Sequence, residues 1–190
     1  MINRCPWTKD DAQMNEYHDT EWGVPVHDDD KLFEFIVLDT FQAGLSWQIV
    51  LRKRENFRKA FAGFNAEKIA RFNDKKVAAL LLDEGIIRNK AKIIATIDNA
   101  KVFLELKKTY GSFDAFIWKF TKQKTVVNKW KSLSEIPTHS PESDAMSAEL
   151  KKLGFRFAGT TICYAFMQAA GMINDHLVSC PRHKQVTGNR

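Results

Sequence analysis

Residues 32–54 read LFEFIVLDTFQAGLSWQIVLRKR and decide the fold prediction, because their apolar residues recur at helical spacing. Leu32, Phe35 and Ile36 fall on one face of a helix that begins at the acidic run before them. A second helix is expected over 47–62, after a turn of small residues. The stretch lacks the strict alternation of a half-buried strand, so it predicts two consecutive helices.

Helical patterns continue along the rest of the chain, with capping residues and glycines at their limits. Ser140 followed by Pro141 is a strong helix start, and Gly171 ends the last long pattern. Further helices are expected over 75–82, about 88–110, from 112 onward, 141–153 and 160–170. Residues 125–127 are the one candidate strand, and 133–142 look like an exposed connector. The prediction is an all-α protein of about eight to ten short helices.

Length and composition fit one domain with a sizeable core, or two small helical lobes around a cleft. Of the 190 residues, 44% are hydrophobic and 27% are charged. No apolar run approaches the roughly 18 residues of a membrane span, and residues 1–6 lack a signal-peptide core. We therefore expect a cytoplasmic protein that does not act at a membrane. The net charge of +6 is compatible with a nucleic acid partner but does not require one.

Two cysteines and two histidines are candidate metal ligands. His176 and Cys180 are four residues apart, so on a helical turn both side chains could bind one ion. Cys5 and His18 could complete a tetrahedral zinc shell, which would have no open position and would be structural. The spacing alone is equally compatible with four unrelated residues.

The remaining cysteine and histidines have simpler interpretations. Cys163 lies among apolar residues and is expected to be buried as a small hydrophobic side chain. His27, His139 and His183 lie in polar, loop-like contexts and are expected at the surface. A cytoplasmic chain of this size needs no disulfide.

Asp39 is the candidate catalytic residue of the segment 32–54. It shares the apolar face of its helix, where a carboxylate is costly to bury unless it meets a donor or a positive charge. The alternative is a carboxylate at a frayed helix end beside Thr40.

Aromatic residues could form a binding slot beside that carboxylate. Trp47 begins the second helix just after Gly44, a residue that permits close approach of the backbone. Together with Trp7, Tyr17 and Trp22 it could stack on a flat, electron-poor ring. Each of these residues taken singly also fits ordinary core packing.

Several stretches, in the same order and over essentially the whole chain, resemble the 3-methyladenine DNA glycosylase I family. They are RCPW (4–7), YHDTEWGVP (17–25), QAGLSW (42–47), LRKRE (51–55), GIIR (85–88), Gly154, GTTICY (159–164) and NDH (174–176). Runs of this length in one order are far more specific than a single short motif.

The resemblance implies a helix-hairpin-helix fold with two helical lobes around a base-binding cleft, forming one domain over 1–190. The N- and C-terminal segments would make one lobe, and residues from about 25 to 125 the middle helical part. A structural zinc ion on the four candidate ligands would join the two ends of the chain. The hairpin would run from Gly154 to Gly159 and open onto Thr160, where backbone N–H groups could bind a DNA phosphate. The turn at Gly85 is a weaker candidate, and either turn could be an ordinary helix connection.

The resemblance also implies roles for the residues of the slot. Trp47 would stack on a base flipped out of the duplex, with Trp7, Tyr17 and Trp22 lining the pocket. Asp39 would accept hydrogen bonds from the base edge. In the loop around Gly44, Gln42 and Leu45 would fill the gap left in the DNA.

One position departs from the family pattern, which has Glu followed by Gly where this chain has Asp39 and Thr40. Asp keeps the charge but is one methylene shorter, about 1.5 Å of reach. Because a misplacement of about 1 Å can lower a rate about a hundredfold, the departure bears on catalytic efficiency. It does not affect the family resemblance.

The implied activity is hydrolysis of the N-glycosidic bond of 3-methyladenine in alkylated double-stranded DNA, a base-excision repair step that releases 3-methyladenine. The methylated base is cationic and leaves readily, and a carboxylate at Asp39 would favour it over neutral adenine. Activation of water by Asp39 is a second role to consider. No lysine stands out as a Schiff-base nucleophile, so a monofunctional enzyme without strand cleavage is expected. A monomer is expected because the sequence shows no heptad pattern and no extended exposed apolar face.

Two other classes of function stay open. The Asp39-Thr40 departure would suit a non-catalytic protein that binds alkylated DNA and releases no base. A zinc hydrolase on a small substrate is disfavoured, because four protein ligands would close the metal site. Whether 3-methylguanine is also a substrate is not fixed by the sequence.

Overall fold

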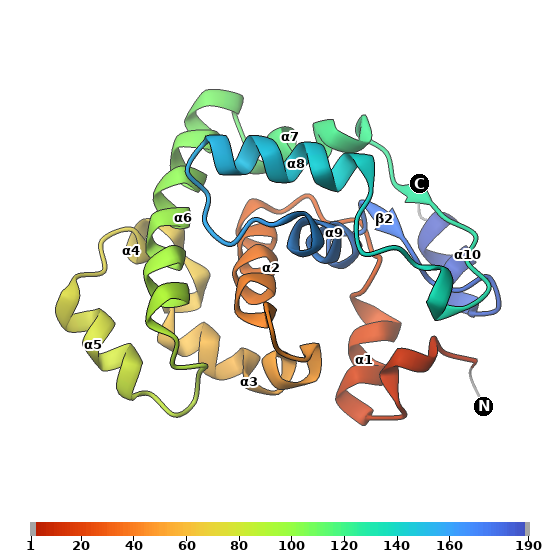
Figure 1. Ribbon diagram of the computed structural model, residues 1–190, viewed down its shortest axis with the longest axis horizontal. Helices are drawn as coiled ribbons and strands as arrows, with labels where there is room; N and C mark the ends of the chain where they lie inside the picture. Colours follow the sequence, from red (N-terminus) through yellow and green to blue (C-terminus); the bar gives the residue numbers. More distant parts are fainter. Residues whose placement is uncertain (1–2, 189–190) are drawn as a thin grey trace.

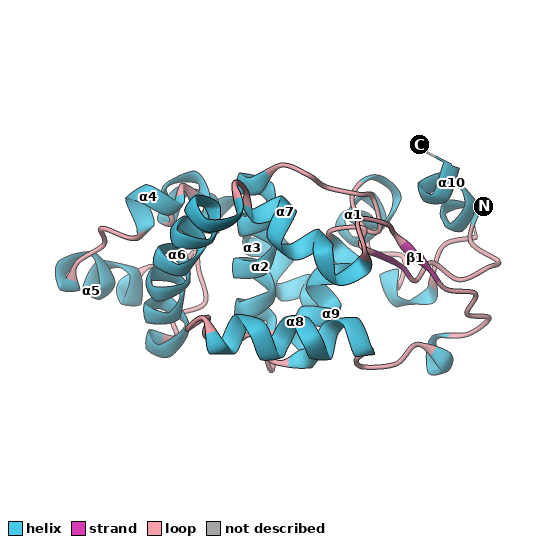
Figure 2. Cartoon of the chain, turned by 90° about the horizontal axis from the view of Figure 1, so that it is seen from above, coloured by secondary structure: helices cyan, strands magenta, loops and turns pink. Residues whose placement is uncertain are grey.

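The two helices expected from residues 32–54 are present in a computed structural model that describes residues 3–188. They are α2 (Asp29–Gln42) and α3 (Trp47–Ala60). The side chain of Asp28 caps α2 by accepting a hydrogen bond from the Lys31 amide at 2.8 Å. The all-α prediction is confirmed, since helices make up nearly all of the regular structure (Figures 1 and 2).

Ten α-helices and two short strands lie within the described residues. The other helices are α1 (Ala12–Thr20), α4 (Ala66–Ile69), α5 (Asp74–Leu82), α6 (Lys90–Tyr110), α7 (Phe113–Trp118), α8 (Pro141–Lys152), α9 (Thr160–Ala169) and α10 (Pro181–Gly188). Four 3₁₀ turns accompany them: Pro6–Thr8, Ala62–Phe64, Lys119–Thr121 and Leu133–Glu135. None of the described helices is long and apolar enough to cross a membrane.

The sequence patterns missed three helices and one strand. Helices α1, α4 and α10 are short or mostly polar; α1, for example, buries only Met14, Tyr17 and His18. So few buried positions give no recurring apolar pattern to detect. The expected strand is present as β1 (Val126–Val127), and it pairs in parallel with β2 (Ile173–Asn174), which the sequence did not indicate.

Helix α2 lies at the centre of the core. Every residue from Leu32 to Phe41 is buried, because α2 packs against α3, α6, α7 and α9 on all sides (Figure 1). A helix covered all round buries whatever side chains it carries, including Asp39. The alternative of a frayed helix end at this residue is therefore wrong, since α2 continues to Gln42.

Helices α8 and α9 pack against each other and are joined by the hairpin, residues 153–159. Ser140 and Ser143 form a capping box at the start of α8, with Pro141 in its first turn. Gly154, at a φ of 93°, ends α8 in a conformation that favours glycine. This is the helix-hairpin-helix element implied by the resemblance.

The two ends of the chain lie on the same side of the molecule, where α1 faces the segment containing β2 and α10 (Figure 1). A second apolar cluster holds them together, separate from the main core. Its buried members are Cys5, Met14, Tyr17, Trp22, Leu51, Leu177 and Cys180. Helices α4 and α5 lie at the opposite end of the molecule (Figures 1 and 2).

Gly171 lets residues 23–26 lie directly against the end of α9. The amide of Gly23 donates to the Gln168 carbonyl and that of Val26 to the Ala170 carbonyl, both at 3.1 Å. A Cβ on Gly171, whose φ is 70°, would lie 2.3 Å from the backbone of Val24. The close approach therefore requires glycine for both space and conformation.

Gly171→Ala should destabilise the protein more than Gly63→Ala does. Gly63 has nearly the same φ, 68°, but an added Cβ there meets nothing within 4 Å. Gly63→Ala therefore tests conformation alone and should cost about 1 kcal/mol of unfolding free energy, whereas Gly171→Ala should cost at least about 2 kcal/mol more. Equilibrium urea unfolding measures both values. Equal losses would show that the contact with residues 24–25 relaxes without cost.

Candidate functional site

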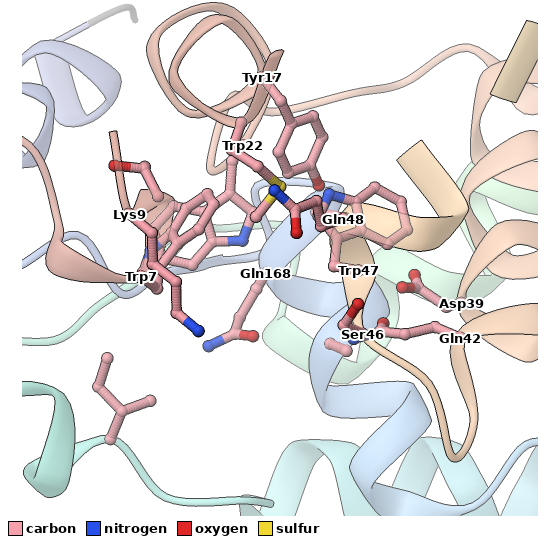
Figure 3. A pocket seen from close by; sticks show the side chains of 15 residues that line it. Trp7, Lys9, Tyr17, Trp22, Asp39, Gln42, Ser46, Trp47, Gln48 and Gln168 are labelled. Atoms are coloured by element: carbon pink, nitrogen blue, oxygen red, sulfur yellow. The ribbon is translucent and has the colours of Figure 1, made fainter. Parts of the chain in front are cut away.

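A cavity of about 360 Å³ opens between the first turn of the chain, α1, the start of α3 and the inner face of α9 (Figure 3). Most of its wall is aromatic or apolar, and a few polar groups face it. The lining residues are Trp7, Thr8, Lys9, Met14, Tyr17, Trp22, Asp39, Gln42, Ser46, Trp47, Gln48, Ile136, Ala165, Gln168 and Ala169. The size and lining suit a flat organic ring.

Asp39 reaches this cavity from the central helix α2. Its side chain is 2% exposed, and its Oδ2 atom has no hydrogen-bond partner within residues 3–188. Burial raises the pKa of the carboxyl group well above its ordinary value, because no positive charge or donor offsets the loss of water. The site thus contains a carboxyl group poised for a partner that the protein does not supply.

The four predicted aromatic residues lie together around the cavity (Figure 3). The rings of Trp7 and Trp22 meet edge to face at 5.0 Å, and those of Tyr17 and Trp47 are tilted at 5.1 Å. The indole N–H groups of Trp7 and Trp47 are buried without an acceptor in the described part of the chain. Since buried polar groups are normally paired, two donors and a carboxylate oxygen are left for a bound molecule or water.

The loop between α2 and α3 carries the next group of predicted residues. Gln42 lines the cavity, and Gly44 has a φ of 79° with open space beyond it. Leu45 is 41% exposed at the tip of the loop and does not line the cavity. The loop therefore presents a large apolar side chain to solvent beside the opening of the pocket.

Sequence reasoning missed Gln168, whose position within an apolar helix gave no signal. Its Nε2 group donates to Asp175 at 2.7 Å, and its Oε1 atom, on the cavity wall, has no donor within residues 3–188 (Figure 3). Asp175 is 1% exposed and also accepts hydrogen bonds from Asn128, Trp130 and Tyr164, at 2.6 to 2.7 Å. Four donors on one buried carboxylate hold this wall of the pocket in place.

Eight further lining residues were also not predicted, and four of them have long side chains. Met14 and Gln48 face the cavity from α1 and α3, and Ile136 reaches it from the connector that was expected to be exposed. That connector is largely exposed, with Ile136 half-buried. Lys9 lies at the rim, so the structure brings one lysine to the opening that the sequence had not singled out.

The structure brings the four candidate metal ligands into one buried cluster. The ligand atoms of Cys5, His18, His176 and Cys180 all lie within 4.8 Å of one another. Hydrogen bonding with Cys5, and then with His176 and His18, lowers the pKa of the Cys180 thiol, while the contact with Cys180 and burial raise that of Cys5. Two sulfur and two nitrogen donors at this separation match the tetrahedral donor set that binds zinc.

Neighbouring groups fix the orientation of both imidazole rings. His18 bonds to Asp19 through Nδ1 at 2.8 Å, so its Nε2 atom faces Cys180. His176 bonds to the Trp22 carbonyl through Nε2 at 3.0 Å, so its Nδ1 atom faces both sulfur atoms. Metal-binding histidines are characteristically oriented by such second contacts. The same bond to Trp22 ties the cluster to the pocket wall.

The hairpin leads through Gly159 to Thr160 at the start of α9, as expected. The expectation for Gly154 was wrong, because this residue ends α8 and its amide donates to the Lys151 carbonyl at 3.0 Å. The N–H groups of the first turn of a helix lack partners in the helix and attract anions. The Thr160 hydroxyl, however, is bonded to Asp144 and Ser143 of α8, so only its backbone is available. At the weaker candidate, Gly85, the amide is already bonded to Asp83 at 2.8 Å, as in an ordinary helix connection.

The other cysteine and two of the three histidines are placed as predicted. Cys163 is buried in the main core, and His27 and His139 are exposed. The prediction for His183 was wrong, because this residue is half-buried and its Nε2 atom bonds to the Asn128 carbonyl at 2.7 Å. The missed helix α10 and the strand pair bring these two residues together.

Comparisons with known proteins agree with this geometry. Residues 7–183 match the family model described as methyladenine glycosylase. The DNA-3-methyladenine glycosylase 1 of Escherichia coli (strain K12) is 49% identical over 179 residues, which are 94% of this chain and 96% of that protein.

Solved structures give the same result. A crystal structure of a 3-methyladenine DNA glycosylase I (TAG) is 47% identical, with a TM-score of 0.92 and coverage of 94% of this chain and 98% of the other. A structure describing 3-methyladenine recognition by the Staphylococcus aureus enzyme is 30% identical, with a TM-score of 0.92 over 100% of this chain and 98% of that one. The chain therefore belongs to the methyladenine glycosylase family.

Proposed function

We propose that this protein is a DNA glycosylase that hydrolyses the N-glycosidic bond of 3-methyladenine in alkylated DNA, as the first step of base-excision repair. The observation that carries the proposal is the aromatic cavity with Asp39 at its wall, in a chain of this family. The related enzymes are 3-methyladenine DNA glycosylases, which indicates the base that is released. The aromatic rings and the carboxyl group of the cavity are groups that could recognise this base.

The charge of the substrate explains how the pocket would select it. An ionised Asp39 is costly in the empty pocket, as its raised pKa indicates. A neutral adenine offers no compensating charge, whereas an N3-methylated adenine in DNA is cationic and pairs with the carboxylate. The aromatic faces of Trp7, Trp22 and Trp47 add a cation–π attraction for the same base.

The reaction requires little acid catalysis, because the methylated base is already positively charged before it leaves. The C1′–N9 bond breaks with both electrons going to the cationic base, which leaves as neutral 3-methyladenine. A water molecule adds to C1′ of the sugar and loses its proton to solvent. Asp39 would stabilise the charge on the base and the developing charge on the sugar; accepting the proton from water is the less favoured role. The reaction needs no lysine nucleophile, and we propose a monofunctional enzyme.

Access to the base would depend on the two surface elements beside the pocket. Leu45 and Gln42 would occupy the space that the flipped nucleotide leaves in the duplex, since they flank the opening. The backbone of Gly159 and Thr160 would bind a phosphate at the start of α9. Phosphate contacts of this kind position the duplex without reading its sequence.

The Cys5, His18, His176 and Cys180 cluster would hold a structural zinc ion. All four positions are protein ligands, so the ion would have no place for water and would cross-link the two ends of the chain. This argues against a zinc hydrolase. We further propose one domain over 1–190 that works as a monomer in the cytoplasm.

A non-catalytic protein that binds alkylated DNA stays as the second candidate, because Asp39 is one methylene shorter than the family's Glu. The two candidates differ in one product, the free base. If Asp39 is active as it stands, the shorter reach is compensated by the position of the base or by a bridging water molecule.

Substitution of Asp39 tests the catalytic assignment. Asp39→Asn should lower the rate of 3-methyladenine release from alkylated duplex DNA by roughly 10- to 100-fold, because the carboxylate charge is lost. Asp39→Glu keeps the charge, extends its reach, and should be at least as active as the unaltered protein. Chromatography of released bases provides the measurement. Full activity of Asp39→Ala would remove both roles, and no release by the unaltered protein would favour the non-catalytic candidate.

The same residue predicts a dependence of stability on pH. Because the folded protein holds the Asp39 proton more tightly than the unfolded chain, Asp39 stabilises the fold below the ordinary carboxyl pKa. This contribution is lost, by about 1.4 kcal/mol per pH unit, as pH rises toward the raised pKa. Asp39→Asn should lack this loss and be the more stable protein at higher pH. Urea unfolding of both proteins at a series of pH values measures this difference. The same change of unfolding free energy with pH in both proteins would contradict the prediction.

Removal of one cysteine tests the zinc site. The unaltered protein should contain about one zinc ion per chain, and Cys180→Ser should lose it and unfold at a temperature lower by roughly 5 °C or more. Cys163→Ser is the matched control, because Cys163 is buried in the main core away from the cluster. Metal analysis and thermal unfolding give the two readouts. Purified protein without stoichiometric zinc would contradict the assignment.

A further inference from the structure

Helix α6 carries a row of buried polar side chains for which the pocket gives no use. Lys92, Thr96 and Asn99 are 5%, 0% and 1% exposed. Their spacing of four and then three residues places them on one face of the helix. Polar groups in such positions cost stability unless each is paired, so the partners of this row are informative.

Lys92 is bonded to the loop that leads into the pocket. Its Nζ group donates to the carbonyl of Phe41 at 2.8 Å and to that of Ala43 at 2.6 Å. These carbonyls belong to the C-terminal end of α2, where a helix leaves carbonyl groups unpaired and attracts a positive charge. Lys92 therefore fixes the point where the chain leaves α2, between Asp39 and Leu45.

Asn99 is bonded to the hairpin. Its Nδ2 group donates to the Arg156 carbonyl at 3.0 Å, and its Oδ1 atom accepts from the Arg156 amide at 2.7 Å. One side chain thus satisfies both backbone groups of a residue at the centre of the hairpin. Thr96, between the two, bonds within the described residues only to the Lys92 carbonyl of its own helix, at 2.9 Å.

We propose that Lys92 and Asn99 are positioning residues that set the separation between the base-flipping loop (residues 42–46) and the phosphate-binding hairpin (residues 153–159). The two anchors are seven residues apart on one helix, about 10 Å along its axis. Helix α6 packs against α2 and spans 21 residues without interruption (Figure 1). It acts as a rigid spacer between the element that enters the duplex and the element that holds its backbone.

This inference rests on the proposed function, and it predicts different defects at the two anchors. Lys92→Met keeps the length of the side chain but loses its donors, so Leu45 should be held less firmly. The turnover rate on alkylated duplex DNA should fall on the order of tenfold, with affinity for undamaged duplex changed less than about twofold. Asn99→Ala should do the reverse, weakening duplex binding on the order of tenfold with turnover at saturating DNA nearly unchanged.

Hydrogen exchange of the DNA-free protein tests the positioning independently of activity. In Lys92→Met, the amides of residues 43–48 should exchange several-fold faster, and those of residues 155–158 should not change. In Asn99→Ala, residues 155–158 should exchange faster, and residues 43–48 should not change. Thr96→Val is the matched control, buried on the same face but bonded to neither segment, and should change neither exchange nor kinetics. Lys92→Gln serves the same test if Lys92→Met does not fold.

The outcomes separate the two proposals. Unchanged exchange in both segments, or the same kinetic defect at both anchors, would overturn the role of α6. Absence of 3-methyladenine release by the unaltered protein would overturn the proposed function, while the exchange rates would still decide whether Lys92 and Asn99 hold their segments.

Discussion

The burial of residues 32–41 of α2 is the constraint on which the rest of the structure depends. Because α3, α6, α7 and α9 all pack against it, both carboxyl groups of this stretch, Glu34 and Asp39, are buried. Glu34 is paired with Arg54 and Arg58, whereas Asp39 faces only the cavity. The packing that stabilises the core is therefore also what makes Asp39 reactive toward a cation. The end of the same helix leads directly into the loop of Gly44 and Leu45, so one element carries the centre of the core, the buried carboxyl group and the loop that we propose enters DNA.

Networks of polar side chains fix the positions of segments that the apolar core alone does not hold in place. Asp175 accepts hydrogen bonds from four donors, including Gln168 of the pocket wall. Lys92 and Asn99 bind the backbone of the loop after α2 and of the hairpin. Apolar packing tolerates small slips, whereas a hydrogen bond at 2.6 to 3.0 Å does not. These hydrogen bonds surround a cavity in which three buried polar atoms, on Trp7, Asp39 and Trp47, have no partner within residues 3–188, as expected of a site prepared for a ligand.

The parts that could be predicted from sequence are those with a local cause. The periodicity around Leu32 and Phe35 gave α2, and the serine–proline pair at 140–141 gave the start of α8. The pairing of β1 with β2, the hydrogen bond between His183 and Asn128, and the hydrogen bonds from Asn128 and Trp130 to Asp175 behind Gln168 join residues 45 to 55 positions apart. No pattern within one segment encodes such contacts. The spacing of His176 and Cys180 only suggested that Cys5 and His18 could join them, and the family resemblance strengthened this hypothesis.

The second apolar cluster has a consequence for how the chain is made. Its members come from the first 22 residues, from α3 and from the stretch around Leu177 and Cys180, so nearly the whole chain separates its two halves. During synthesis this cluster can be completed only after the stretch around Leu177 and Cys180 has left the ribosome. The pocket wall formed by Trp22, whose carbonyl is bonded to His176, is therefore fixed late.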